Sequence, residues 1–129
     1  MLLISLIKLQ MSEKTPNFIE HIIVDDISSG LTKDVLRFRF PPEPNGYLHI
    51  GHVKAICLNF NLGNKYNAPV NLRFDDTNPV KEEAQFVHAI KRDIEWLVFQ
   101  WDKECYASDY FAKLFDWAKN LINKGFAYA

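Results

Sequence analysis

The segment from Arg39 to His52, which reads RFPPEPNGYLHIGH, constrains the fold of this chain more than any other. Its three prolines cannot continue a strand or a helix, so the chain must turn after the apolar alternation that ends at Phe40. Beyond the turn, four apolar residues follow the spacing i, i+3, i+4, i+7 that is typical of a helix: Val53, Ile56, Cys57 and Phe60. The segment therefore predicts a strand, a turn and the start of a helix, in that order.

This order of elements predicts an anion-binding site at the start of the helix. The first turn of a helix has free backbone N–H groups and the positive end of the helix dipole, and phosphate suits both. His49 and His52 are three residues apart, so both imidazoles can reach the same phosphate, and Gly51 lets a ligand approach the backbone. The spacing alone also fits an alternative, in which His49 only starts the helix and His52 is a partly buried core residue.

The whole segment resembles the signature of the class I aminoacyl-tRNA synthetases, which ends in His-Ile-Gly-His. A second block from Asn71 to Glu83, NLRFDDTNPVKEE, resembles the next conserved segment of that family. The resemblance extends from about Asn17 to Ala129 and is strongest to the members that charge tRNA with glutamine. The glutamyl members of the same subclass are the nearest alternative. The family fold implies an α/β class, namely the amino-terminal half of a Rossmann-like nucleotide-binding fold with parallel strands and flanking helices.

The resemblance also implies roles for individual residues. His49 and His52 match the catalytic histidines of the signature, and Asp75 matches the carboxylate that binds the amino group of the substrate amino acid. The neighbouring Asp76 suits a turn, because Asp is common in turns. The residues implied to border or hold ATP are Glu43, Pro44, Asn45, His49, Ile50, Gly51, His52, Val53, Lys54 and Ala55. Lys54 fits a solvated helix position as well as a phosphate contact.

The implied reaction is the ATP-dependent activation of glutamine and its transfer to tRNA-Gln. ATP is a substrate, Mg²⁺ is expected to accompany it, and no protein-bound metal is expected. Two other classes of function fit parts of the pattern: a small nucleotidylyltransferase with an HxGH turn, and a non-catalytic interaction domain. The family's second signature, a Lys-Met-Ser-Lys-Ser-like loop, has no counterpart in the chain. We therefore expect a fragment of the enzyme that is inactive alone.

Composition predicts one globular unit. The 129 residues are 48% hydrophobic with a formal net charge of −1, which gives no overall basic surface for nucleic acid. Cys57 and Cys105 lie far apart in the sequence and outside any metal-ligand pattern, so a cytoplasmic, reducing location is expected. The apolar start, residues 1–10, is shorter than the roughly 20 residues of a membrane span, and we interpret it as an appended or mis-assigned extension. Residues 11–33 are expected to form a helical arm, and residues 34–129 the first part of the catalytic domain.

The remaining elements follow from apolar spacing and from turn residues. We expect strands over 36–40 and 69–74 and helices over 18–29, 50–65 and 81–99. A last helix with a strong apolar stripe is expected to be capped by Ser108 and ended by Gly125.

Overall fold

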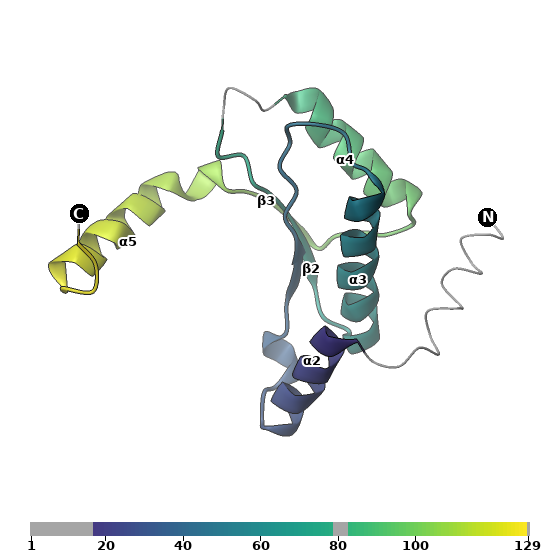
Figure 1. Cartoon of the computed structure of the whole chain (residues 1–129), viewed down its shortest axis with the longest axis horizontal. Helices are drawn as coiled ribbons and strands as arrows, with labels where there is room; N and C mark the ends of the chain where they lie inside the picture. The colour runs from purple at the N-terminus through teal and green to yellow at the C-terminus, as the bar shows by residue number, and fades with distance from the viewer. Residues whose placement is uncertain (1–16, 79–82, 129) are drawn as a thin grey trace.

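The computed structural model of the protein describes residues 17–78 and 83–128, which form a parallel sheet with helices around it (Figure 1). The elements in chain order are α2 (Phe18–Ser28), η1 (Lys33–Val35), β1 (Phe38–Phe40), α3 (Ile50–Tyr66), β2 (Val70–Phe74), α4 (Ala84–Trp96), β3 (Lys103–Tyr106), η2 (Ser108–Tyr110) and α5 (Phe111–Asn123). Residues 1–10, interpreted above as an extension, lie outside the described residues.

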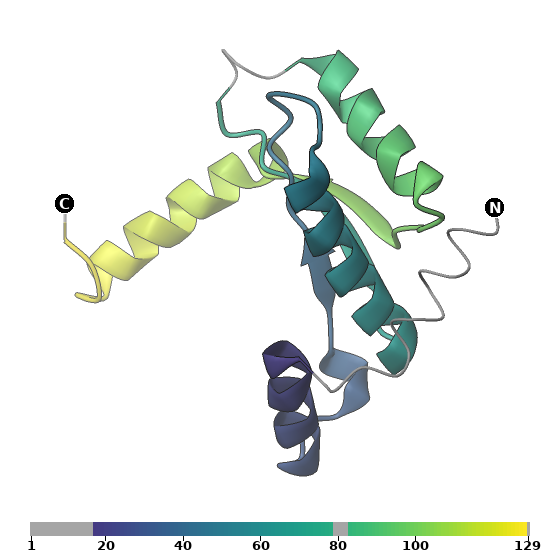
Figure 2. The ribbon, with the colours of Figure 1, turned by 45° about the vertical axis from the view of Figure 1, so that its right-hand side comes forward.

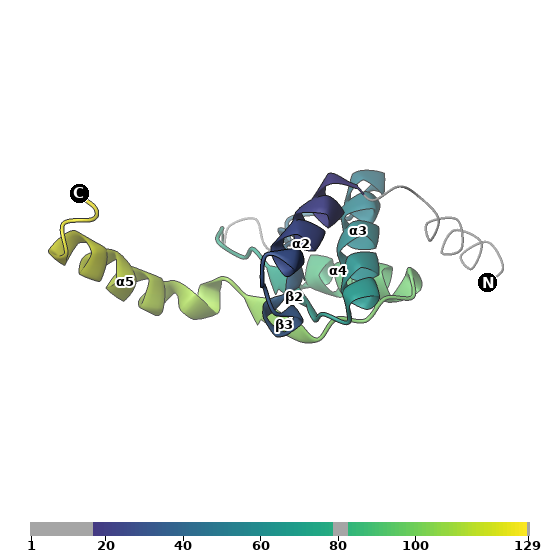
Figure 3. The same cartoon turned by 90° about the horizontal axis from the view of Figure 1, so that it is seen from below.

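The three strands pair in the order β1-β2-β3 and are all parallel. Phe38 lies beside Val70 in the register, and Leu72 lies beside Glu104. Helices α3 and α4 connect successive strands, and both lie on the same side of the sheet (Figures 1 and 3). The predicted α/β class and the adjacent parallel strands are confirmed, whereas β3 was not predicted. The predicted strand over 36–40 is shorter, because pairing with the neighbouring strand begins only at Phe38, whose N–H donates to Pro69 O at 3.0 Å.

The core fills the space between the sheet and these two helices. Its buried residues come from β1 and β2, from α3 and α4, and from the segment after α4: Phe40, Ile56, Phe60, Val70, Leu72, Phe74, Ile90, Ile94 and Phe99. Helix α3 approaches β2 very closely at Gly63, where a β-carbon would lie 2.3 Å from the Val70 side chain. A glycine is therefore required for this contact, and the contact sets the distance of α3 from the sheet.

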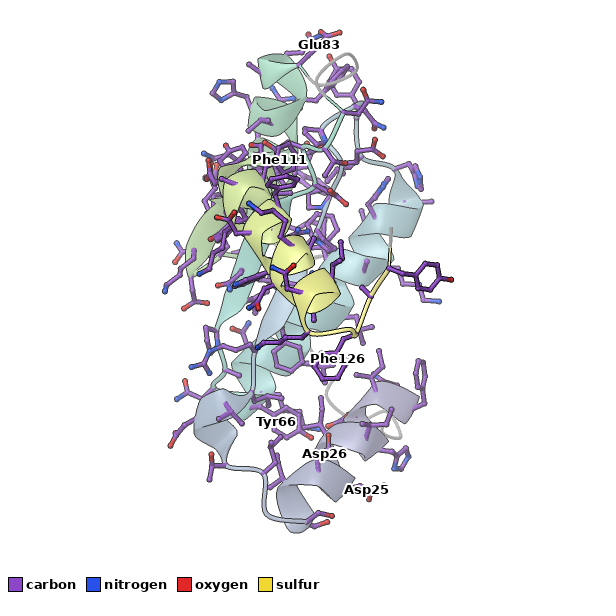
Figure 4. The ribbon with its side chains drawn as sticks, turned by 90° about the vertical axis from the view of Figure 1, so that its left-hand side faces the viewer. Asp25, Asp26, Tyr66, Glu83, Phe111 and Phe126 are labelled. Carbon is purple, nitrogen blue, oxygen red and sulfur yellow. The ribbon has the colours of Figure 1, made fainter. Side chains whose placement is uncertain are left out.

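Helix α2 is attached to the far end of α3 by a polar cluster. Glu20 is buried, and its carboxylate accepts hydrogen bonds from Lys65 Nζ and from the Tyr66 hydroxyl, the latter at 3.1 Å. Figure 4 shows Tyr66 between the two helices. The apolar residues of this arm are divided between two environments, because Ile23 is buried and Ile19 and Ile27 are half-buried, while Phe18 is 74% exposed. The Glu20 ion pair and the buried Ile23 thus both hold the arm.

Helix α4 ends earlier than predicted. Its last residue is Trp96, and Val98 adopts a left-handed conformation with φ 63°. The Val98 N–H donates to Glu95 O at 2.8 Å, and the Phe99 N–H donates to Ile94 O at 3.2 Å. These two bonds form a Schellman motif, which ends the helix. The predicted start of this helix at Lys81 lies outside the described residues.

Helix α5 extends away from the sheet on the side opposite to α3 (Figures 1 and 2). None of its residues is buried. Gly125, with φ 73°, ends the helix as predicted. The prediction that Ser108 caps it is wrong, because α5 begins after Tyr110 and the Ser108 hydroxyl donates to Asp76 instead.

Candidate nucleotide-binding site

His49 and His52 form a reciprocal cap at the start of α3. His49 is the N-cap residue, and its Nδ1 accepts the Gly51 N–H at 3.0 Å. His52 Nδ1 accepts the His49 N–H at 3.1 Å. The two rings lie with their centroids 4.0 Å apart. This arrangement resembles a capping box in which imidazoles replace the usual hydroxyl and carboxylate.

The cap determines which ring nitrogens are free to bind a ligand. A neutral imidazole has one donor and one acceptor nitrogen, and here both Nδ1 atoms accept. Nε2 of each ring therefore carries the hydrogen and remains available as a donor. The alternative in which His49 starts the helix is confirmed at Nδ1. Binding of a ligand through Nε2 stays a prediction.

The surroundings of His52 favour its neutral form. Burial lowers the pKa of His52, and the nearby positive charge of His49 lowers it further. A protonated Nδ1 could not accept the His49 N–H, so the neutral form is also the one that the cap requires. In this form His52 presents its Nε2 hydrogen as a neutral donor, which can stabilise negative charge without releasing a proton.

Gly51 makes this ring arrangement possible. A β-carbon at Gly51 would lie 2.8 Å from Cε1 and 3.0 Å from Nδ1 of His49. The sequence predicted that Gly51 admits a ligand to the backbone, and the structure adds that it makes room for the His49 ring. Ile50, next to it, is 83% exposed, so the start of α3 is open to solvent.

The loop between β1 and α3 is held to the end of β2 and to the start of α4 by backbone hydrogen bonds. The Asp75 N–H donates to Pro42 O at 2.9 Å, and the Glu83 N–H donates to Pro44 O at 3.3 Å. Pro44 is fully buried, whereas Glu43 and Asn45 on either side of it are exposed. The loop is thus anchored by its prolines and presents its polar side chains to solvent.

Asp75 and the histidine pair lie at the same edge of the sheet, as predicted. Strands β1 and β2 are parallel, so both end at this edge, and the bond from Asp75 to Pro42 joins the two ends directly. Ligands of open α/β sheets bind at this carboxyl edge. No hydrogen bond or ion pair to the Asp75 carboxylate is found within residues 17–78 and 83–128.

Asp76 has the structural role that its turn context predicted. Its carboxylate accepts the Ser108 N–H at 2.9 Å and also the Ser108 hydroxyl. This contact joins the end of β2 to the start of η2. Asp76 is therefore occupied within the fold, whereas binding of a ligand by Asp75 stays a prediction.

Three residues near the site were not predicted from the sequence. Asp93 and Trp96 of α4 line a hollow together with His49 and Leu48, and Trp96 is 70% exposed. Tyr47 packs edge-on against Phe86 with ring centroids 5.1 Å apart, which fixes the loop against α4. Helix α4 lies far from the signature in sequence, so no local pattern linked its residues to the site. The one possible indication was a tryptophan, Trp96, at the end of that helix.

The predicted ATP-binding residues on α3 occupy two different environments. Lys54 is exposed and Val53 and Ala55 are half-buried, with Ala55 packed against the core. The arrangement brings the loop, the first turn of α3 and Asp75 to one edge of the sheet. This geometry suits a nucleotide whose phosphates face the helix start and an amine that faces Asp75.

A parallel sheet with a histidine-capped helix at its carboxyl edge is the arrangement of a nucleotide-binding α/β domain, and comparison with known families agrees. The model of the class I tRNA synthetase (E and Q) catalytic domain matches residues 35–129. The chain belongs to this family.

Similarity to individual curated proteins is also high. A glutamine–tRNA ligase of Haemophilus influenzae is 60% identical over 116 residues, which are 89% of this chain and 21% of that protein. A glutamine–tRNA ligase of Yersinia enterocolitica is 59% identical over 113 residues, which are 87% of this chain and 20% of that protein. The chain thus spans about a fifth of the length of these relatives.

Within the described residues, no group of three or more His, Cys, Asp or Glu side chains could hold a metal ion. No helix in that part of the chain has the length and apolar character needed to cross a membrane.

Proposed function

We propose that this chain forms the ATP- and glutamine-binding edge of a glutamine–tRNA ligase. The observation that carries the proposal is the position of the His49 and His52 donors and the Asp75 carboxylate at one edge of the sheet, in a chain about 60% identical to such ligases. The substrates would be ATP, glutamine and tRNA-Gln, and the reaction would belong to cytoplasmic translation.

In the first step, a carboxylate oxygen of glutamine attacks the α-phosphorus of ATP. The bond from this phosphorus to the bridging oxygen breaks, and pyrophosphate leaves with the bonding electrons. The Nε2 hydrogens of His49 and His52 and the free N–H groups of the first turn would donate to the phosphate oxygens as charge increases in the transition state. Asp75 would hold the ammonium group, which orients the attacking carboxylate.

In the second step, the 2′ hydroxyl of the terminal ribose of the tRNA attacks the carbonyl carbon of the adenylate, and AMP leaves. Neither step needs a covalent bond to the protein. The signature loop, with Glu43, Pro44 and Asn45, and the α3 residues up to Ala55 would border the nucleotide. Mg²⁺ would be brought by the triphosphate and would neutralise part of its charge.

The proposal is tested with a chimaera in which this chain replaces the matching segment of the Haemophilus influenzae ligase. We expect glutamine-dependent exchange of pyrophosphate into ATP by the chimaera, with glutamate as the comparison substrate. The chain alone should show no exchange above a His49→Ala/His52→Ala control. A folded chimaera without exchange, or one that prefers glutamate, would overturn the proposal.

A further inference from the structure

The backbone around Asp75 is tied to the chain segments that follow both neighbouring strands. Asp75 comes directly after β2 and belongs to no helix or strand. Its N–H donates to Pro42 O at 2.9 Å, in the segment after β1. The residue before it, Phe74, accepts the Ala107 N–H at 3.0 Å, in the segment after β3. These backbone bonds fix the chain as far as Asp75, and the chain beyond Asp75 is fixed in a different way.

Side-chain bonds of the next residue, Asp76, hold the chain beyond Asp75. Oδ1 of Asp76 accepts the Ser108 N–H at 2.9 Å, and Oδ2 accepts the Ser108 hydroxyl. Ser108 follows Ala107, which is 2% exposed and therefore a firm anchor. Hydrogen bonds to a carboxylate are among the stronger ones, and two of them to one residue restrict both its position and its rotation. Asp75 is thus enclosed between two residues that are both tied to the segment after β3.

A helix cap explains only one of the two bonds between Asp76 and Ser108. Ser108 is the first residue of η2, and its N–H has no partner within that short helix. Oδ1 of Asp76 satisfies this N–H, which is all that a cap requires. The bond from the hydroxyl to Oδ2 is not needed for the cap, but it fixes the rotation of the carboxylate. Since Asp76 is covalently joined to Asp75, the same restraint limits the directions in which the Asp75 side chain can point.

The direction of the Asp75 carboxylate matters for the ligand that we assign to it. A hydrogen bond from an ammonium group weakens steeply when its angle falls below about 120°. A carboxylate that is already aimed at the ligand also loses less conformational entropy when the ligand binds. A restraint on Asp75 therefore increases affinity for an amine without contacting the amine itself.

We propose that Ser108 is a positioning residue for the amino-acid site, and that it acts through Asp76. Its hydroxyl holds the Asp76 carboxylate, and this contact sets the direction in which the Asp75 carboxylate meets the ammonium group of the substrate. The inference rests on the proposed function, in which Asp75 binds that ammonium group.

The experiment measures pyrophosphate exchange by the chimaera with glutamine and ATP varied in turn. Ser108→Ala removes the hydroxyl but keeps the backbone N–H, so η2 keeps its cap. We expect the KM for glutamine to rise about 3-fold to 30-fold, while the KM for ATP changes less than about 2-fold. Ser108→Thr keeps a hydroxyl and should return the KM for glutamine to within about 2-fold of the parent value. An unchanged KM for glutamine in Ser108→Ala, or no recovery in Ser108→Thr, would overturn the inference.

The matched control removes a serine hydroxyl that makes a comparable hydrogen bond elsewhere. The Ser28 hydroxyl donates to Asp25 O at 2.8 Å within α2. Ser28→Ala should leave both KM values at the level of the parent. A rise in the KM for glutamine equal to that of Ser108→Ala would show that the effect is not specific to Ser108, and would overturn the inference.

A double-mutant cycle with Asp75→Asn separates positioning from support of the fold. If Ser108 acts through the charge of Asp75, Ser108→Ala should lower kcat/KM for glutamine in the parent but change it less than about 2-fold in the Asp75→Asn background. A residue that only supports the fold would lower kcat/KM for both substrates in both backgrounds, together with the unfolding temperature. That result would also overturn the inference.

The same measurements separate this inference from the proposed function. A raised KM for glutamine in Asp75→Asn, with no effect of Ser108→Ala, would retain the function and overturn the inference. A KM for glutamine that Asp75→Asn leaves unchanged would refute the ammonium site, and the positioning role would fail with it.

Discussion

Replacing His49 by Asn and by Ala separates the two roles that the structure gives this residue. Nδ1 of His49 caps α3 through the Gly51 N–H at 3.0 Å, whereas its Nε2 hydrogen is available for a phosphate. Asn is among the best N-cap residues, and its side-chain oxygen can accept the same N–H. Asn therefore keeps the cap but removes the imidazole donor, and Ala removes both.

The expected magnitudes differ between the two measurements. Loss of an N-cap side chain costs about 1 kcal/mol, so His49→Ala should lower the unfolding temperature of the chain by about 4 to 8 °C, while His49→Asn should stay within about 2 °C. Loss of one donor to transition-state charge costs about 10²-fold to 10³-fold in rate. In the chimaera, both variants should therefore slow adenylate formation by this amount, with a smaller change in ATP binding.

Thermal unfolding of the chain and single-turnover adenylate formation by the chimaera provide the two numbers. If His49→Asn restored both stability and rate, the residue would act only as a cap, and the chemical role would be refuted. If neither variant changed stability, the capping geometry itself would be wrong.

Three further predictions concern the scaffold. Gly63→Ala should destabilise the chain by about 1 to 2 kcal/mol in urea unfolding, because its β-carbon would lie 2.3 Å from the Val70 side chain. The control is Gly46→Ala, whose β-carbon would have nothing within 4 Å. Equal losses of stability in the two variants would contradict the argument. Val98→Asn should stabilise the chain by about 1 kcal/mol, since the side chain is 59% exposed at φ 63°; a loss of stability would refute the strain. The Lys65 hydrogen bond lowers the pKa of Glu20 below 4.5, so its contribution is present above about pH 4.5 and lost as pH falls through the lowered value. Unfolding free energies between about pH 6 and pH 3 should fall less in Glu20→Gln than in the parent chain, and parallel curves would argue against the ion pair.

The sequence predicted the part of the fold that is dictated by local signals. The prolines before Tyr47 and the apolar spacing after it fix a strand, a turn and a helix start over a short stretch, so the positions of His49 and Asp75 followed. The strand β3 was missed because its residues, KECY, are exposed or half-buried at the edge of the sheet and show no apolar alternation. The cap assigned to Ser108 was wrong because its partner, Asp76, lies 32 residues away in the sequence. Long-range pairing of this kind leaves no local pattern.

The same limit applies to the site. The spacing of the two histidines placed them on the first turn, but only the structure shows that both Nδ1 atoms are occupied by the cap. Trp96 lines the same pocket as His49 but comes from another helix. It was not predicted, because apolar periodicity alone does not show which residues of α4 face α3.

The most direct test of the shared ATP and glutamine site is the Asp75→Asn variant of the chimaera. Its steady-state kinetics are measured with each substrate varied in turn. Asn keeps the shape of the side chain but lacks the charge that would hold the ammonium group of glutamine. We predict a large rise in the KM for glutamine with the KM for ATP nearly unchanged, and an unfolding temperature equal to that of the parent. Equal losses for both substrates together with a lower unfolding temperature would contradict the assignment of this edge of the sheet as the shared ATP and glutamine site.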